Sequence, residues 1–361
     1  MEDNKDYTRG VLKVYESFTD EEYNVSRCLG YSKLKDIYDN PEILIEEDRV
    51  KKAEWLDFGT LVDLILTDPT SLDDKVYIND TLPTEQFKNI AEYMVENDLW
   101  LDPMLLTDEQ IEEAYSQSGS NVKWLIDTKR KKLVEECSDY IQLLTTHRDK
   151  LIVTSDLFNE ATKVAEVFCT HRWTRDLFLD EETQKKHGIE ILYQFKIKYV
   201  YNNLVCKSKI DVLVVDHANK LIIPWDIKTG SDYPRTFIRS GIYKYRYCYQ
   251  GVLYREGLKA FIKKIDALKD YKIGLFGFVY ISRAKPVYPV KVRISEYLHE
   301  QIRDSGVDNS TYELLSLNEI VEATNFYVAK ADEGTPMVEP LDLYDSSGEI
   351  ILGPVSKGYP F

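Results

Sequence analysis

Residues 209–230 read Lys-Ile-Asp-Val-Leu-Val-Val-Asp-His-Ala-Asn-Lys-Leu-Ile-Ile-Pro-Trp-Asp-Ile-Lys-Thr-Gly. Two apolar runs rich in β-branched residues flank the polar residues 217–220, which is the pattern of two strands joined by a short turn. Asp211 lies in the first predicted strand, and Asp226 and Lys228 lie near the end of the second. Because strand side chains alternate between faces, Asp226 and Lys228 should share a face. This stretch therefore predicts an antiparallel pair of strands that carries charged residues.

Charged side chains inside apolar strands need a physical reason, because burial of an uncompensated charge is costly. If Asp211 lies on the same face as Asp226 and Lys228, two carboxylates and one ammonium converge. A divalent cation would offset the repulsion between the carboxylates, and such a cluster is typical of a metal-dependent phosphodiesterase. The alternative is a solvent-facing strand end whose Asp–Lys pair has no function. The apolar residues on both sides favour the functional interpretation.

A helix is predicted after these strands, from about residue 236 to Gly257. Gln250 and Tyr254 are four residues apart and should therefore lie on one face of it. Tyr254 fits a packing role equally well, whereas an amide such as that of Gln250 in an aromatic-rich helix usually has a specific hydrogen-bond partner. Gln194, in the strand that precedes the quoted stretch, is a weaker candidate for the site.

The order Asp211, Asp226-x-Lys228 and Gln250-x-x-x-Tyr254 resembles the RecB-like branch of the PD-(D/E)XK nuclease superfamily. The likeness is greatest to the RecE-like (exonuclease VIII type) exonucleases of phages and prophages. Residues 31–41, 58–69 and 278–290 also resemble segments of that family, so the likeness touches most of residues 25–300. It implies an α/β (α+β) fold in which helices flank a central mixed sheet with an antiparallel meander, plus a helical insertion.

The resemblance also implies which residues form the site. Many relatives have a metal-binding histidine four residues after the glycine of the Gly59-Thr60 pair, where this chain has Asp63. An aspartate is a hard oxygen donor that can replace imidazole around Mg²⁺ or Mn²⁺. The alternative is that Asp63 lies on a helix surface and faces water. By the resemblance, the catalytic residues are Asp211, Asp226, Lys228, Gln250 and Tyr254, and the metal ligands are Asp63, Asp211, Asp226 and the backbone carbonyl of Ile227.

The activity implied is a Mg²⁺-dependent DNA exonuclease, with Mn²⁺ as a possible substitute, that hydrolyses phosphodiester bonds at double-stranded ends in the 5′→3′ direction. The family context is phage recombination and DNA processing in the cytoplasm of a bacterial host. Its implied partners are double-stranded DNA with free ends, a single-strand annealing protein and further copies of the chain. An endonuclease of the same fold and a catalytically inactive DNA-binding relative remain alternatives. The presence of Asp211, Asp226 and Lys228 together favours an active enzyme.

The charge distribution agrees with a nucleic-acid partner, although the whole chain has a net charge of −16. Residues 181–300 contain 22 Lys and Arg against 12 Asp and Glu, a balance of +10 that leaves −26 for the rest. A basic groove on an acidic body suits binding of a phosphate backbone. The alternative is that scattered lysines only aid solubility.

The spacing of the cysteines and the shortness of the apolar runs argue against several other classes of protein. The five cysteines are widely spaced, with no Cys-x-x-Cys pair and none after Cys248, so no zinc site, disulfide framework or iron–sulfur cluster is predicted. The sequence contains no run of 18 apolar residues, so no membrane span is predicted. The first residues lack the features of a secretory signal.

Four regions are predicted along the chain. Residues 1–67 form the N-terminal helical part of the nuclease domain, 68–150 an acidic helical insertion, 151–300 the catalytic core and 301–361 an acidic C-terminal extension. Residues 190–229 are predicted to form a three-stranded meander whose first turn is Asn202-Asn203. The insertion has two interpretations, a wall of a DNA channel or a separate protein-binding module.

Overall fold

A computed structural model describes residues 10–44, 54–99, 105–283, 288–308 and 313–332. Parts of the predicted N-terminal region (1–9 and 45–53) and of the C-terminal extension (333–361) lie outside these residues, as do 284–287 within the 278–290 segment. The chain divides into two compact units, residues 1–67 with 164–361, and residues 68–163. Each unit is described by itself.

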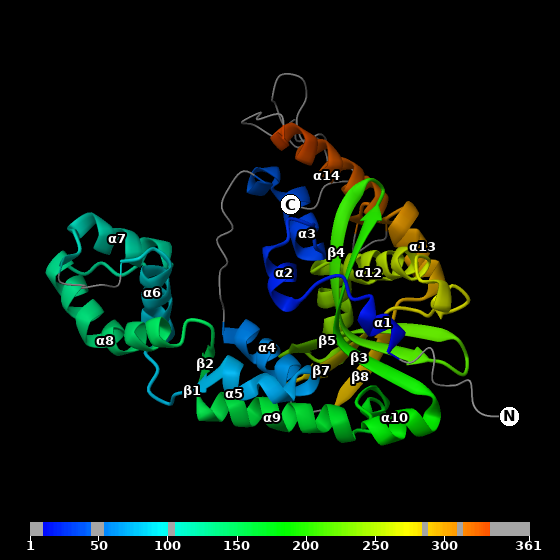
Figure 1. Ribbon diagram of the computed structural model, residues 1–361. Helices are drawn as coiled ribbons and strands as arrows, with labels where there is room; N and C mark the ends of the chain where they lie inside the picture. Colours follow the sequence, from blue (N-terminus) through cyan, green and yellow to red (C-terminus); the bar gives the residue numbers. More distant parts are fainter. Residues whose placement is uncertain (1–9, 45–53, 100–104, 284–287, 309–312, 333–361) are drawn as a thin grey trace. The chain divides into compact units, whose positions relative to one another are not determined.

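A six-stranded mixed sheet forms the centre of the first unit (Figure 1). In spatial order its main strands are β3 (Ile189–Tyr201), β4 (Leu204–Asp216), β5 (Leu221–Gly230), β7 (Gly277–Ser282) and β8 (Pro289–Arg293), and β6 (Lys272–Ile273) pairs with the start of β5. β3, β4 and β5 form an antiparallel meander, β7 runs parallel to β5, and β8 runs antiparallel to β7. The predicted meander and the central mixed sheet are confirmed.

The turn between β3 and β4 explains why these strands are long and closely paired. Asn202 and Asn203 have φ angles of 45° and 68°. Two residues of positive φ form a two-residue turn whose twist matches that of the strands, and asparagine tolerates this conformation well. The turn predicted at Asn202-Asn203 is confirmed.

Helices cover the sheet and enclose a core. α12 (Tyr247–Ile262) packs against β3 and β4, and α3 (Tyr31–Asp39), α13 (Glu296–Asp304) and α14 (Leu317–Asp332) pack around α12 (Figure 1). Side chains such as Phe195, Ile210, Leu253, Phe278 and Val321 are fully or almost fully buried there. Burial of such side chains is the main favourable contribution to folding, about 1.5–3 kcal/mol each. α4 (Glu54–Thr67) contacts β5 and β4, and α10 (Glu181–His187) contacts β3.

The single helix predicted from residue 236 to Gly257 is wrong in two respects. The segment consists of α11 (Pro234–Phe237), a π-helical segment η5 (Ile238–Lys244) and α12. Arg246, with a φ of 62°, lies between η5 and α12. The helix also continues past Gly257 to Ile262. A Cβ atom at Gly257 would lie 2.3 Å from the Tyr199 ring, so this glycine allows close packing of α12 on β3 and does not end the helix.

The second unit is mainly helical, with a core of its own. Its elements are α5 (Leu72–Lys75), β1 (Val76–Ile78), α6 (Glu85–Glu96), α7 (Asp108–Gln117), α8 (Ile126–Thr146) and β2 (Leu151–Val153), and α9 (Ser155–Thr170) contains the boundary between the units. Ile90, Met94, Ile111 and Leu133 are fully buried between α6, α7 and α8. Helices make up most of the described part of residues 68–150, and β1 and β2 add a short parallel pairing.

The remaining elements are short. They are α1 (Val11–Val14), α2 (Asp20–Val25), β9 (Val307–Asp308), β10 (Glu313–Leu314) and the 3₁₀ segments Pro41–Leu44, Pro69–Ser71, Arg175–Leu177 and Asp266–Leu268. None of the helices in the described part of the chain has both the length and the apolar character needed to cross a membrane.

Gly277 allows the Trp225 ring to pack closely against strand β7. It lies opposite Trp225 in the pairing of β7 with β5, and a Cβ atom there would be 2.3 Å from the indole ring. Gly277→Ala is therefore expected to lower the free energy of unfolding by about 1–3 kcal/mol, because Trp225 is buried and must shift. Thermal melts would measure this change. Gly30→Ala is the control, since its Cβ would have one neighbour at 3.9 Å, and equal melting temperatures for the two variants would contradict the prediction.

Candidate active site

The candidate site lies where strands β4 and β5 separate. Their pairing ends at Val212 and Trp225, although both strands continue. Beyond that point the backbone N–H of Ile227 donates a hydrogen bond of 2.7 Å to Oδ2 of Asp211. A carboxylate thus takes the place of a backbone acceptor, because a buried N–H group needs a partner. Asp211 is held in the opening between the two strands.

The regular alternation of side chains between the two faces of β3 and β4 is interrupted near Gln194 and Asp211. Leu192 and Phe195 of β3, and Ile210 and Leu213 of β4, all contact the core that contains α12. Strict alternation places residues two or four apart on one face, not three. Gln194, which lies opposite Asp211 by register, has no pairing partner there and has a φ of 51°. This conformation is uncommon for a residue other than glycine, and Gln194 adopts it inside a strand.

The position of Asp211 does not follow from regular alternation. The sequence leaves open whether Asp211 shares a face with Asp226 and Lys228. Asp211 lies at an interruption of the β3–β4 pairing and beside the gap between β4 and β5. The two carboxylates still affect each other electrostatically. Their proximity results from the separation of the strands and not from regular alternation.

Asp226 is the most deeply buried carboxylate of the group, with 2% of its surface exposed. The Gln250 amide donates a hydrogen bond of 2.5 Å to its Oδ1, and the Lys228 ammonium lies 2.6 Å from its Oδ2. Although Oδ2 is in ion-pair contact with Lys228, it receives no well-directed hydrogen bond. The structure therefore brings Asp226, Lys228 and Gln250 together, as expected from the sequence.

Asp63 on α4 is partly buried and belongs to the same cluster. The side-chain amide of Gln194 donates to both of its carboxylate oxygens, at 2.9 Å each. The pKa of Asp63 is raised to about 6, because burial and the charge of Asp226 outweigh the opposing effects of Lys209, Lys228 and the hydrogen bond from Gln194. Gln194, a weaker candidate from the sequence, thus positions Asp63.

The charges of Asp211 and Lys228 respond to the same surroundings. Burial raises the pKa of Asp211 well above its usual range, and repulsion from Asp226 and Asp63 adds to the effect. For Lys228, burial by itself favours the neutral amine, but attraction to Asp226 and Asp211 outweighs it and raises the pKa. Lys228 is therefore a persistent positive charge and is unsuited to act as a general base at neutral pH.

Tyr254 and Tyr247 complete the surroundings. Tyr254 is buried with its ring against Phe276, at 6.0 Å between centroids. Burial raises its pKa well above the usual range, and the nearby charges of Asp226 and Asp211 add to the effect. The Lys228 ammonium lies 4.9 Å from the centre of the Tyr247 ring. Such a cation–π contact limits where the ammonium can move. Tyr254 packs beside the carboxylates, as one of its two predicted roles requires.

Lys209 and Tyr247 are further members of the site that were not predicted from the sequence. Apart from burial, Lys209 is the largest influence on the pKa of Asp63. Its position two residues before Asp211 in an apolar strand is a signal that could have found it. Tyr247 had no distinguishing signal in a segment that contains many tyrosines.

The donor atoms at this site fit a hard divalent cation. Carboxylate oxygens of Asp63, Asp211 and Asp226 are the ligand type that Mg²⁺ and Mn²⁺ prefer. The raised pKa values and the incompletely satisfied Oδ2 of Asp226 indicate more negative charge than the described residues neutralise. No three ligating side chains converge as a ready-made metal cluster within the described ranges. In this conformation the carboxylates instead bind Gln194, the Ile227 N–H, Gln250 and Lys228.

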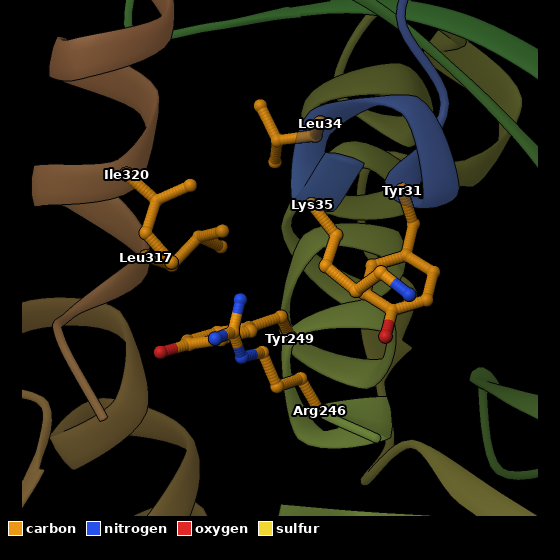
Figure 2. A pocket seen from close by; sticks show the side chains of 7 residues that line it. All are labelled: Tyr31, Leu34, Lys35, Arg246, Tyr249, Leu317 and Ile320. Carbon is orange, nitrogen blue, oxygen red and sulfur yellow. The ribbon is translucent and has the colours of Figure 1, made fainter. Parts of the chain in front are cut away.

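A small cavity lies between α3, α14 and the start of α12 (Figure 2). Its volume is about 10 Å³, which is room for one water molecule. Arg246 at its edge forms an ion pair with Asp39. The cavity is too small for a substrate. Its lining residues are Tyr31, Leu34, Lys35, Arg246, Tyr249, Leu317 and Ile320.

Comparisons with known proteins do not establish a family. No protein-family model matches the chain, and no curated protein matches it. A crystal structure from Eubacterium rectale, described as a "putative exonuclease", is similar to 94% of this chain and 96% of its own. The sequence identity is 12% and the TM-score is 0.42. At that level the likeness carries no inference about the site.

Proposed function

We propose that this protein is a metal-dependent DNA exonuclease that hydrolyses phosphodiester bonds at double-stranded ends in the 5′→3′ direction. The observation that carries the proposal is the cluster of Asp63, Asp211 and Asp226 with a persistently charged Lys228, at the gap between β4 and β5. Carboxylates can hold a metal ion that assists hydrolysis of a phosphodiester, and a fixed lysine charge can stabilise the phosphate in the transition state. The resemblance of their order to the RecE-like nucleases of the PD-(D/E)XK superfamily supports the same function.

The carboxylates of Asp63, Asp211 and Asp226, with the Ile227 carbonyl, would hold one or two Mg²⁺ ions, with Mn²⁺ as a substitute. When bound, such ions neutralise charge on the scissile phosphate and lower the pKa of water. Gln250 fixes the orientation of Asp226 through its hydrogen bond, and Gln194 does the same for Asp63. Groups that orient metal ligands in this way contribute to affinity without touching the ion.

Lys228 supplies the fixed positive charge of the site. Its raised pKa keeps the ammonium protonated at neutral pH, where it stabilises the negative charge that develops on the phosphate. The contact with the Tyr247 ring and the ion pair with Asp226 hold this charge in place. Tyr254 braces the carboxylates from α12. We assign the attacking nucleophile to water and assign no proton transfer to Lys228.

The assay that tests the proposal uses linear and covalently closed circular duplex DNA, with Mg²⁺ or with EDTA, and compares wild type with Asp226→Ala. We expect Mg²⁺-dependent loss of linear DNA alone, and no loss with the variant. Cleavage of the closed circle would favour the endonuclease. Salt-sensitive binding with no cleavage would favour an inactive DNA-binding relative. Duplexes labelled at the 5′ or at the 3′ end then test the direction.

The pH dependence of stability is a second test of the carboxylate cluster. Asp63 has a pKa of about 6 in the folded chain, above its unfolded value of roughly 3.9. A raised pKa contributes stability that is fully present below the unfolded value and is lost as pH rises through about 6. The metal-free protein should therefore gain stability from Asp63 between pH 7 and pH 5.

Thermal melts in EDTA at these two pH values, for wild type and Asp63→Asn, measure this contribution. The difference between the two proteins should be larger at pH 7, where the wild-type carboxylate is ionised. A difference that does not change with pH would contradict the raised pKa. With Mg²⁺, which favours the ionised carboxylates, the wild-type protein should instead lose stability on acidification.

Phage recombination or DNA processing is the biological setting that we infer from the family resemblance. A single-strand annealing protein and self-assembly into a homo-oligomer are part of the same proposal. Sedimentation of the purified protein would test self-assembly, and the fraction of the chain found as monomer would decide it.

A further inference from the structure

An exposed pair of aromatic rings lies at the edge of the sheet, away from the carboxylate cluster. β8 is the last strand in the order of the sheet, and Tyr288 directly precedes it. The Tyr288 ring meets the Trp173 ring edge to face, with 6.1 Å between centroids. Trp173 is 44% exposed and Tyr288 is 37% exposed. Two exposed rings in contact offer faces on which a planar, apolar group can stack.

Positive charge surrounds these rings. The Arg172 guanidinium lies 5.4 Å from the centre of the Trp173 ring, and Arg175 is exposed in the same segment. On β8, Lys291 pairs with Asp176 at 2.6 Å, whereas Arg293 has an aromatic contact and no ion pair. Within the described residues, Arg172, Arg175 and Arg293 all lack an acidic partner. Three uncompensated guanidinium groups on a chain of net charge −16 indicate an anionic ligand.

One row of residues crosses the edge of the sheet beside this surface. Trp225, Gly277 and Arg293 lie opposite one another across β5, β7 and β8. Because Gly277 has no side chain, the Trp225 indole extends across β7, and the Arg293 guanidinium lies 4.6 Å from its centre. Trp225 directly precedes Asp226 on β5, so strand alternation places its side chain on the opposite face of the sheet from that carboxylate.

We propose that Trp173, Tyr288, Arg172, Arg175 and Arg293 form a binding surface for single-stranded DNA. Unpaired bases expose their faces and stack on aromatic side chains, while arginines bind the phosphates between them. The bases of a duplex are stacked on one another, so Trp173 and Tyr288 offer little to a double-stranded ligand. The surface goes beyond the proposed hydrolysis, because binding there needs neither metal nor cleavage. Only the choice of DNA over RNA rests on the proposed function.

The experiment measures binding of a fluorescein-labelled 15-nucleotide oligo-dT to the full chain in EDTA, by fluorescence anisotropy. Trp173→Ala and Tyr288→Ala are each expected to weaken binding about 5- to 100-fold, the range for loss of one stacked base. Arg172→Gln and Arg293→Gln should each reduce the slope of log K against log salt by about 0.7. Tyr297→Ala, which removes a ring that is 76% exposed on α13, is the matched control and should bind like wild type.

Three results would overturn the inference: no binding of oligo-dT by wild type, equal affinity of wild type and Trp173→Ala, or an equal loss of affinity for a blunt hairpin duplex. Tighter binding of oligo-U RNA of the same length would overturn the assignment to DNA. Circular dichroism spectra establish that each variant is folded. Asp226→Asn separates the two proposals, since it should bind oligo-dT like wild type. Failure of the wild type to cleave DNA would leave this binding result intact.

Discussion

Asp211→Asn is expected to reduce DNA hydrolysis about 10³-fold or more and, at the same time, to raise the melting temperature of the metal-free protein. The loss of activity follows because an amide is a neutral and much weaker ligand for a divalent cation than a carboxylate. The gain in stability follows from the electrostatics of the folded chain. Burial and the charges of Asp226 and Asp63 raise the pKa of Asp211, so its ionised form destabilises the fold at neutral pH.

Asparagine is the informative substitution because it changes the charge and preserves the contact. Its side-chain oxygen can still accept the hydrogen bond from the Ile227 N–H, which Asp211 accepts at 2.7 Å. A gain of 1 kcal/mol corresponds to about 2–4 °C in a protein of this size. The measurements are thermal melts in EDTA and initial rates of cleavage with Mg²⁺.

The matched control is Asp270→Asn, which removes one negative charge from a side chain that is 69% exposed. It should leave the cleavage rate unchanged and shift the melting temperature by less than about 1 °C, as is usual for a surface substitution. A fall in the melting temperature of Asp211→Asn would show that the carboxylate charge is stabilised in the fold, contrary to the raised pKa. Retained cleavage would remove Asp211 from the proposed mechanism.

Lys228→Met is expected to lower the stability of the protein, whereas Asp211→Asn raises it. Both substitutions are expected to reduce DNA hydrolysis. Methionine is similar in length but lacks the ammonium, so Asp226 loses the partner 2.6 Å from its Oδ2. Removing one member of a buried ion pair typically costs about 3–5 kcal/mol, and partial exposure of Lys228 places this case at the low end. Cleavage should fall roughly 10²- to 10³-fold, as for loss of a group that stabilises transition-state charge.

A double variant distinguishes electrostatics from packing in this prediction. Asp211→Asn combined with Lys228→Met removes one charge of each sign and should melt at a higher temperature than Lys228→Met alone. Lys263→Met, at an exposed position after α12, is the control for loss of a lysine and should behave like wild type. If the double variant melts below Lys228→Met, the carboxylates do not repel one another as argued.

The meander could be predicted because its signals are local. β-branched runs specify the strands, and Asn202-Asn203 specifies a two-residue turn, so no distant contact is needed to place β3, β4 and β5. The grouping of Asp226, Lys228 and Gln250 was also predictable. Two of these residues share a strand face, and a buried amide needs a partner.

The features that sequence could not predict all depend on distant contacts. Gly257 has the composition signal of a helix end, but the Tyr199 ring on another element requires a glycine there. The interruption at Gln194 depends on the hydrogen bonds that its amide donates to Asp63, 131 residues earlier in the chain. Lys209 affects the pKa of Asp63 because α4 packs against β4 and β5, a contact between segments far apart in the sequence. In each case tertiary structure overrides a local pattern.

The hydrogen bond from the Ile227 N–H to the Asp211 carboxylate links β5 to β4 through a side chain. Asp211 Oδ2 is the acceptor of that backbone N–H, so a change that draws this oxygen away leaves the amide without its acceptor. Hydrogen exchange at the Ile227 amide would then report on the state of Asp211 in the absence of substrate. The amide that reports on Asp211 directly follows the other carboxylate, Asp226, in the sequence.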